Sequence, residues 1–111
     1  MKVLKFGGTS VANSKSLNKV LEIIKNQNDS IVVVVSALAG ITDLLMEMLS
    51  LAESRKDNFK SNLSIIEKLH LEPIKKCIPI QNQSAIISYL KKNLNELETR
   101  LDAIFLLEEV T

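Results

Sequence analysis

The chain has 111 residues, of which 46% are hydrophobic and 24% are charged, and this composition excludes a wholly disordered protein. The 14 basic and 13 acidic residues leave a net charge of +1, which gives no electrostatic argument for binding nucleic acid or an anionic membrane. A single cysteine, Cys77, excludes an internal disulfide, and no apolar run approaches the roughly 20 residues of a membrane span, so we expect a cytoplasmic protein of one domain or part of one.

A strand is expected over residues 2–6, and it ends at the glycine pair Gly7-Gly8. Glycines let the main chain turn sharply and approach a ligand closely, and the first amides of the following helix have no internal partners. Such a junction is typical of a phosphate site, with Lys5 as a nearby cation and the hydroxyls of Thr9 and Ser10 beside it. The structural alternative is a tight connection in which Lys5 is only a solvated strand end. The spacing is neither the Walker nor the Rossmann pattern.

A helix should follow, capped by Asn13 or Ser14 and ending near residues 26–29. The next strand, residues 31–35, is a run of five β-branched apolar residues, which predicts burial on both faces of a parallel sheet. Strand, helix and strand then form a βαβ unit, and ligands bind at the carboxyl ends of such strands. We therefore expect the small-residue loops 7–10 and 36–40 to lie side by side on one edge of the sheet.

The rest of the chain is expected to be helical. Thr42 or Asp43 would cap a helix that ends around residues 53–56, in which Met46 and Met48 are expected to fill gaps in the core. A further helix from about residue 57 should place four apolar residues on one face: Phe59, Leu63, Ile66 and Leu69.

Two prolines, Pro73 and Pro79, are expected to bracket a break before the last helix. His70 has no second ligand at metal spacing, which favours a surface or core histidine, and no residue is assigned to a metal. The last helix, over residues 84–107, should pair antiparallel with the helix before it through an apolar stripe: Ile87, Leu90, Leu94, Leu97, Leu101 and Ile104.

The predicted sheet leaves its edges uncovered, because two strands alone do not make a stable sheet. The chain should either borrow strands from another copy or be the front portion of a larger domain. A homo-oligomer, a dimer or higher, is therefore expected.

Two segments resemble a known family. Residues 3–12, VLKFGGTSVA, are similar to the amino-terminal signature of the aspartate kinases in the amino-acid-kinase superfamily, and residues 35–45, VSALAGITDLL, are similar to its second motif. The resemblance implies an α/β fold, the N-terminal part of the three-layer amino-acid-kinase fold. It makes residues 1–111 a fragment of the catalytic domain, with the phosphate and substrate loops in 1–56 and a helical segment in 57–111. The opening is most similar to the bifunctional branch, in which the kinase is fused to homoserine dehydrogenase.

The resemblance also implies an activity: transfer of a phosphoryl group from ATP, with Mg²⁺, to the β-carboxylate of L-aspartate, the first step toward lysine, threonine and methionine. The implied roles concern eight residues. Lys5 would stabilise charge on the transferred group, the amides of Gly7 and Gly8 would bind phosphates with Thr9 and Ser10 on the same rim, Ser36 and Ala37 would form the facing loop, and Thr42 would help to hold aspartate.

The family's Arg-Gly-Glu segment and its second glycine-rich loop find no match in these residues, so we expect this chain alone to be inactive. Two other interpretations remain. One is a helical interaction module without catalysis, in which the Gly7-Gly8 turn is structural. The other is a related kinase acting on a different carboxylate, a carbamate or a nucleotide, against which the 35–45 motif argues.

Overall fold

The computed structural model describes residues 1–110, with side chains described for residues 1–108. Its first part is a βαβ unit: strand β1 (Lys2–Phe6), a short 3-10 helix η1 (Gly8–Val11), helix α1 (Ser14–Lys25) and strand β2 (Ile31–Val35). The strands pair in parallel, with Lys2 opposite Ile31 and Phe6 opposite Val35. The predicted strand, helix and strand are confirmed.

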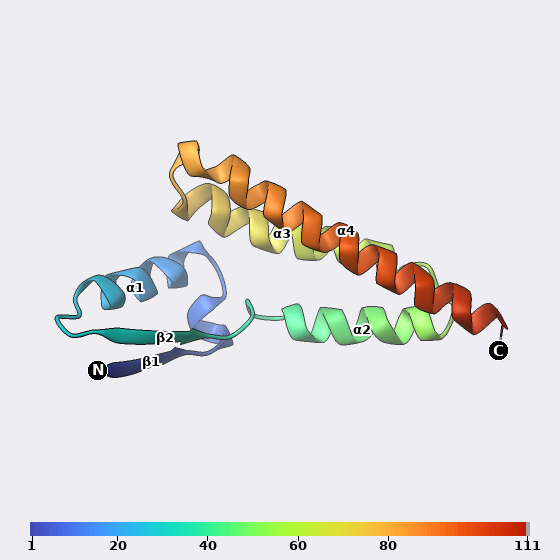
Figure 1. Ribbon diagram of the computed structural model, residues 1–111, viewed down its shortest axis with the longest axis horizontal. Helices are drawn as coiled ribbons and strands as arrows, with labels where there is room; N and C mark the ends of the chain where they lie inside the picture. The colour runs from blue at the N-terminus through green and yellow to red at the C-terminus, as the bar shows by residue number, and fades with distance from the viewer. Residues whose placement is uncertain (111) are drawn as a thin grey trace.

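Three helices complete the fold: α2 (Ile41–Glu53), α3 (Phe59–Cys77) and α4 (Ile80–Val110). Figure 1 shows α2 leading away from the sheet, α3 returning toward α1, and α4 running outward again beside α3. The predicted long last helix and its antiparallel pairing with the preceding helix are confirmed. None of the helices among the described residues combines the length and the apolar character needed to cross a bilayer.

The cap of each early helix is set by a different device. At α1 the Asn13 side chain accepts a hydrogen bond from the Ser16 amide at 3.0 Å, and Ser16 Oγ accepts from the Asn13 amide at 3.1 Å, which is a capping box. At α2 the prediction of Thr42 or Asp43 as cap is wrong. Gly40 occupies that position in the left-handed region, with φ 83°, and no side chain caps the helix. A glycine adopts this conformation without the steric cost of a Cβ, so the helix begins directly after it.

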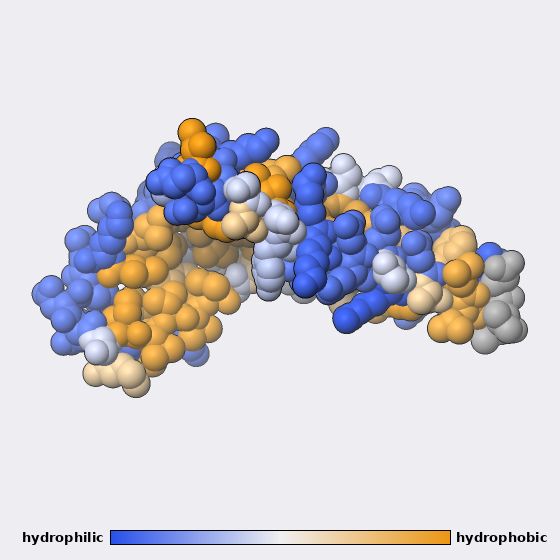
Figure 2. All heavy atoms as spheres, turned by 45° about the horizontal axis from the view of Figure 1, so that its top comes forward, coloured by the Kyte–Doolittle hydropathy of each residue, from blue (hydrophilic) through white to orange (hydrophobic). Residues whose placement is uncertain are grey.

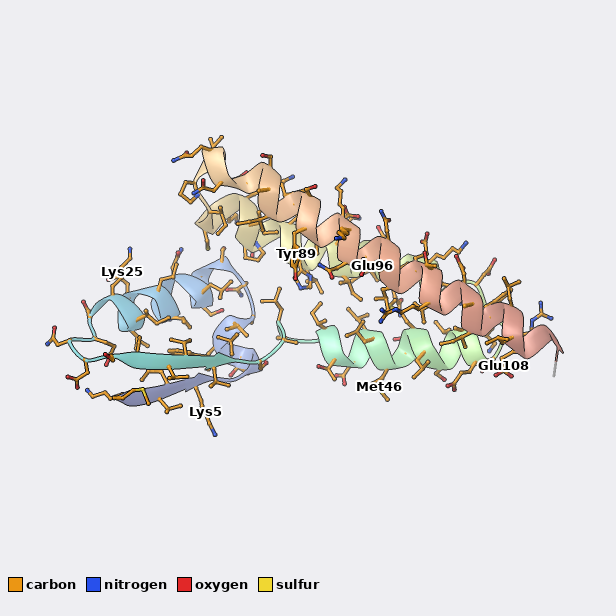
Figure 3. The ribbon with its side chains drawn as sticks, in the orientation of Figure 1. Lys5, Lys25, Met46, Tyr89, Glu96 and Glu108 are labelled. Atoms are coloured by element: carbon orange, nitrogen blue, oxygen red, sulfur yellow. The ribbon has the colours of Figure 1, made fainter. Side chains whose placement is uncertain are left out.

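The core lies among α2, α3 and α4. Phe59, Leu63 and Ile66 are buried as predicted, while Leu69 is 38% exposed at the edge of that face. Met48 is fully buried, but the expectation for Met46 is wrong, since it is 63% exposed (Figure 3). Residues two positions apart on a helix point to nearly opposite sides, so both methionines cannot face one core.

The break between α3 and α4 is shorter than predicted. Pro73 is buried inside α3, which continues to Cys77, so the prediction that Pro73 bounds the break is wrong. The chain leaves the helix at Ile78, whose backbone is extended with φ −97° and ψ 133°. Because the ring of Pro79 disfavours a helical conformation in the residue before it, this proline alone accounts for the break.

The expectation that β2 is buried on both faces is wrong. Val32, Val33, Val34 and Val35 are between 38% and 57% exposed, because only α1 covers the sheet and no third strand pairs with β2 among residues 1–110. Figure 2 shows apolar side chains gathered at the end of the molecule that holds the strands. The chain is also elongated: its radius of gyration is 17.0 Å, whereas a compact domain of this size has about 13 Å.

Candidate functional site

The two small-residue loops meet at the carboxyl end of the sheet. The Ser36 amide donates to the Phe6 carbonyl at 3.0 Å, which carries the pairing of the strands one residue further. A Cβ placed on Gly8 would lie 3.5 Å from Ser36 Oγ, 3.9 Å from Ala39 Cα and 4.0 Å from the Ala37 carbonyl oxygen. The prediction that the loops lie side by side on one edge is confirmed.

The glycine turn is open on its outer side. Gly7 is extended, with φ −77° and ψ 180°, and its carbonyl accepts from the Ser10 amide at 3.0 Å. A Cβ on Gly7 would meet no atom of the described structure within 4 Å. The amides of Gly8 and Thr9 start η1 and have no acceptor within so short a helix. Space for a ligand therefore adjoins backbone donors at this turn.

Thr9 and Ser10 face a cavity of about 360 Å³ between the turn and α1. The cavity also includes Ser16 and Lys19 from the first turns of α1, with Phe6 beneath. Lys19 is a cation at this cavity that no sequence motif indicated, although its position three residues after Ser16 puts both on one helical face. Three hydroxyl-bearing residues and one lysine therefore line this cavity together with apolar side chains of β1 and α1.

Lys5 lies on the other face of the sheet. Its exposed side chain points away from α1 in Figure 3, whereas its neighbour Phe6 lines the cavity with residues of α1. Successive side chains of a strand point to opposite faces, which explains the separation. Lys5 is therefore close to the glycine turn in the sequence, but its ammonium group is directed to the open face of the sheet and not toward Thr9 and Ser10.

The facing loop carries the remaining predicted residues. Ser36 Oγ donates to the carbonyl oxygen of Ala37 at 2.5 Å, so in this structure its hydroxyl is engaged locally. Thr42 is exposed in the first turn of α2, directly after the left-handed Gly40. Ser36, Ala37 and Gly8 are brought together, and Thr42 follows them in the first turn of α2.

The start of α1 is tied to α3 by a pair that the sequence did not suggest. Glu72 Oε1 accepts from the Ser14 amide at 2.9 Å, and Oε2 accepts from Ser14 Oγ at 2.5 Å. The hydroxyl and the amide of Ser14, with Lys76 at 3.4 Å, hold the pKa of the Glu72 carboxyl below its ordinary value. Sequence patterns could not reveal this pair because 58 residues separate its members.

Metal ligands are not clustered in the part of the chain that the structure describes, where no group of three or more His, Cys, Asp or Glu side chains comes together. His70 Nδ1 lies 2.8 Å from the Ile66 carbonyl oxygen one turn earlier on α3. Because a carbonyl oxygen only accepts, this nitrogen carries the proton.

Comparisons with known proteins identify the family. The model of the amino acid kinase family matches residues 1–108. The chain is 32% identical over 105 residues to bifunctional aspartokinase/homoserine dehydrogenase 2 of Arabidopsis thaliana, covering 94% of this chain and 12% of that protein. It is 36% identical over 120 residues to the bifunctional aspartokinase/homoserine dehydrogenase of Buchnera aphidicola, covering 98% of this chain and 14% of that protein.

Comparison with solved structures indicates the same family. E. coli aspartokinase III, in complex with lysine and aspartate, superposes with a TM-score of 0.79 at 28% identity, over 96% of this chain and 23% of that one. The chain therefore spans only a small fraction of the length of its relatives, their N-terminal portion. By the match over residues 1–108 and by these likenesses, the chain belongs to the amino acid kinase family, and within that family its relatives are aspartokinases.

Proposed function

We propose that the complete enzyme containing this chain transfers the γ-phosphoryl group of ATP to the β-carboxylate of L-aspartate. The observation that carries the proposal is the contact of Gly8 with residues 36–39, which joins the two motif loops at the carboxyl edge of the parallel sheet. It is supported by the aspartokinase relatives and by the likeness to E. coli aspartokinase III, which has been solved with aspartate and ADP.

The reaction asks little covalent chemistry of the protein. An oxygen of the aspartate carboxylate attacks the γ-phosphorus, the bond from that phosphorus to the β-phosphate oxygen breaks, and ADP leaves with the electron pair. A carboxylate is already ionised at neutral pH, so no general base is needed. The protein must position the reactants and stabilise the charge on the transferred group.

The glycine turn is suited to the first task. In our proposal the amides of Gly7 and Gly8 donate to phosphate oxygens, and the empty space beside Gly7 lets those oxygens approach the backbone. The rim at Thr9 and Ser10 adds hydroxyl donors next to the turn.

The second task falls to Lys5, which we propose stabilises the charge on the transferred phosphoryl group from the open face of the sheet. Ser36 and Ala37 would line the opposite side of the nucleotide site. The Ser36 hydroxyl would exchange its hydrogen bond to the Ala37 carbonyl for one to a phosphate oxygen. Thr42, exposed at the start of α2, would help to hold the aspartate.

Mg²⁺ would enter with ATP and neutralise part of the phosphate charge. Because residues 1–110 bring no cluster of metal-binding side chains together, we assign no residue of this chain as its ligand. The uncovered strands and the elongated shape support two further proposals: the 111-residue chain has no turnover by itself, and the enzyme assembles at least as a dimer. We place the reaction in the cytoplasm, consistent with a single, half-buried free cysteine.

The test is a hydroxamate assay for aspartyl phosphate with ATP, Mg²⁺ and aspartate, run on the enzyme from the complete reading frame. Lys5→Ala should lower kcat by roughly 100-fold or more, the usual loss when one group that stabilises transition-state charge is removed. Lys2→Ala, at the other end of the same strand, is the matched control and should stay within about twofold. Full activity in Lys5→Ala would contradict the assigned role, and an inactive complete enzyme would contradict the function.

The helical-module interpretation is based on the uncovered sheet edges and on the apolar stripe of α4. The apolar stripe of α4 that it reserves for a partner is used within the chain: Leu101 is buried, and Leu94, Leu97 and Ile104 pack against the core formed with α2 and α3. We therefore do not propose it as a second function.

A further inference from the structure

The first residue of α1 is capped from a distant helix. The local capping box of Asn13 and Ser16 uses their own two amides, so the Ser14 amide between them needs another acceptor. Glu72 of α3 supplies it at 2.9 Å, while its second oxygen accepts the Ser14 hydroxyl. One carboxylate thus satisfies two donors of a single residue.

The surroundings favour a fixed, ionised carboxylate. Ser14 is only 8% exposed, whereas the Glu72 side chain, 36% exposed, is still reached by water. Lys76 Nζ lies 3.4 Å from Glu72 Oε2, one turn later on α3, and Cys77 Sγ lies 3.7 Å from the Ser14 carbonyl oxygen. The amino end of α1 adds a positive partial charge, which also favours a carboxylate there. α3 therefore holds the beginning of α1 by charge-assisted hydrogen bonds.

The beginning of α1 is in turn continuous with the glycine turn. η1 packs on α1, and its last residue, Val11, is 2% exposed. Thr9 and Ser10 share one cavity with Ser16 from the first turn of α1. A shift of α1 relative to the sheet would therefore move the turn that carries the proposed phosphate donors.

The two sides of the proposed nucleotide site are fixed in different ways. The side formed by the loop after β2 is anchored by the hydrogen bond from the Ser36 amide to the Phe6 carbonyl, which continues the pairing of the two strands. The turn side is a short 3-10 helix next to α1, and side chains of α3 hold the beginning of α1: Glu72 accepts two hydrogen bonds from Ser14, and the Cys77 thiol lies near the Ser14 carbonyl oxygen and Asn18. A side chain on α3 can thus control how well the two sides are aligned.

We propose that Glu72 is a positioning residue for nucleotide binding: it holds Ser14 at the start of α1 and thereby sets the place of the 7–10 turn. This inference rests on the proposed function, because it takes the turn to bind the phosphates of ATP. Glu72 itself does not touch the substrate in this account.

The test uses Glu72→Gln in the complete enzyme, with Glu67→Gln as the matched control. Glu67 is also half-buried on α3, but it pairs with Lys91 of α4 at 3.7 Å, away from α1. Glutamine keeps the shape and one acceptor oxygen but loses the charge and the second acceptor. The equilibrium Kd for ADP and the KM for ATP should rise roughly tenfold in Glu72→Gln, the order expected when a charge-assisted bond becomes a neutral one.

A purely structural role would not give this selectivity. We expect the KM for aspartate to change less than about twofold, because Thr42 follows β2 and is not connected through α1. A milder variant, Ser14→Ala, removes only the hydroxyl and keeps the amide bond, so it should raise the Kd for ADP by a smaller factor. In the double variant with Glu72→Gln, the Kd for ADP should rise by less than the product of the two single increases.

Amide hydrogen exchange gives a readout independent of activity. Exchange at residues 8–14 should be faster in Glu72→Gln than in Glu67→Gln, with or without nucleotide. Nucleotide affinity in Glu72→Gln equal to that of Glu67→Gln, in an unsubstituted enzyme that binds ADP, would overturn the positioning role alone. Lack of ADP binding by the unsubstituted enzyme would overturn the proposed function and the positioning role with it.

Discussion

The close packing of Gly8 against the loop after β2 makes a prediction about side-chain size. The Cβ of an alanine there would lie 3.5 Å from Ser36 Oγ and 3.9 Å from Ala39 Cα, which are ordinary contact distances. Among the described glycines only Gly40 has a positive φ, so alanine at Gly8 brings no backbone strain. Gly8→Ala should keep the fold and the contact between the loops.

Valine at the same position should not fit. Its two γ-carbons extend about 1.5 Å beyond Cβ, and they occupy two of the three staggered positions, so the space toward Ser36 and Ala39 is overfilled. Overpacking of this kind costs about 1–3 kcal/mol. If the loops separate to relieve it, nucleotide affinity falls by roughly 5-fold to 150-fold.

The assay is equilibrium binding of ADP to the complete enzyme, with thermal denaturation of the same samples. Gly8→Ala should bind within about twofold of the unsubstituted enzyme, and Gly8→Val at least about fivefold more weakly. Equal affinity and equal Tm in Gly8→Val and Gly8→Ala would show that the two loops do not constrain each other. Close packing of the loops would then not be what forms the site.

Three other predictions follow from single residues. Gly7→Ala should leave stability within about 0.5 kcal/mol but weaken ADP binding, because its Cβ enters the space proposed for phosphate; unchanged binding would move the phosphates elsewhere. Met48→Ala should cost about 2–5 kcal/mol in urea unfolding and Met46→Ala less than about 0.5, and equal losses would contradict their opposite orientations. Hydrogen bonds from Ser14 lower the pKa of Glu72 below its ordinary 4.5, so the pair stabilises the fold above that pH and its contribution disappears as pH falls through the folded-state pKa. The stability difference between the unsubstituted enzyme and Glu72→Gln, from urea unfolding at several pH values, should shrink on acidification; a difference independent of pH would exclude this linkage.

Elements that carry their own local signal were predicted well from the sequence. The β-branched run at Ile31–Val35 specifies a strand, and Asn13, one of the two residues expected to cap the first helix, is the N-cap of α1. The meeting of the 7–10 and 36–40 loops followed from topology, because parallel strands that flank one helix end on the same edge.

Two of the failures, at Pro73 and at the cap of α2, share a physical cause: packing or backbone geometry outweighed a residue's usual preference. Pro73 stays inside α3 because its burial against neighbouring elements compensates for a lost backbone hydrogen bond. Gly40 replaces Thr42 and Asp43 as the cap of α2 because the chain turns there through a left-handed conformation.

The sequence predicted which two loops form the candidate site, but not the directions in which their side chains point. The tight η1 turn sends Thr9 and Ser10 toward α1, while strand alternation sends Lys5 to the other face, and the geometry of that turn is not encoded in a residue spacing. The Ser14 to Glu72 pair depends on where α3 returns to α1, which no local pattern specifies.

The two edges of the sheet differ in how they would meet another chain. β1 carries Lys2 and Lys5, and charged residues on an edge strand discourage further pairing. β2 is IVVVV, with no charge, proline or glycine, and its outer edge has no partner strand among residues 1–110. Such a segment is the kind that seeds cross-β aggregation when it is exposed. Self-association through β2 should therefore limit the solubility of the isolated 111-residue polypeptide. The substitution Val35→Lys, at the most exposed residue of β2, should raise that solubility.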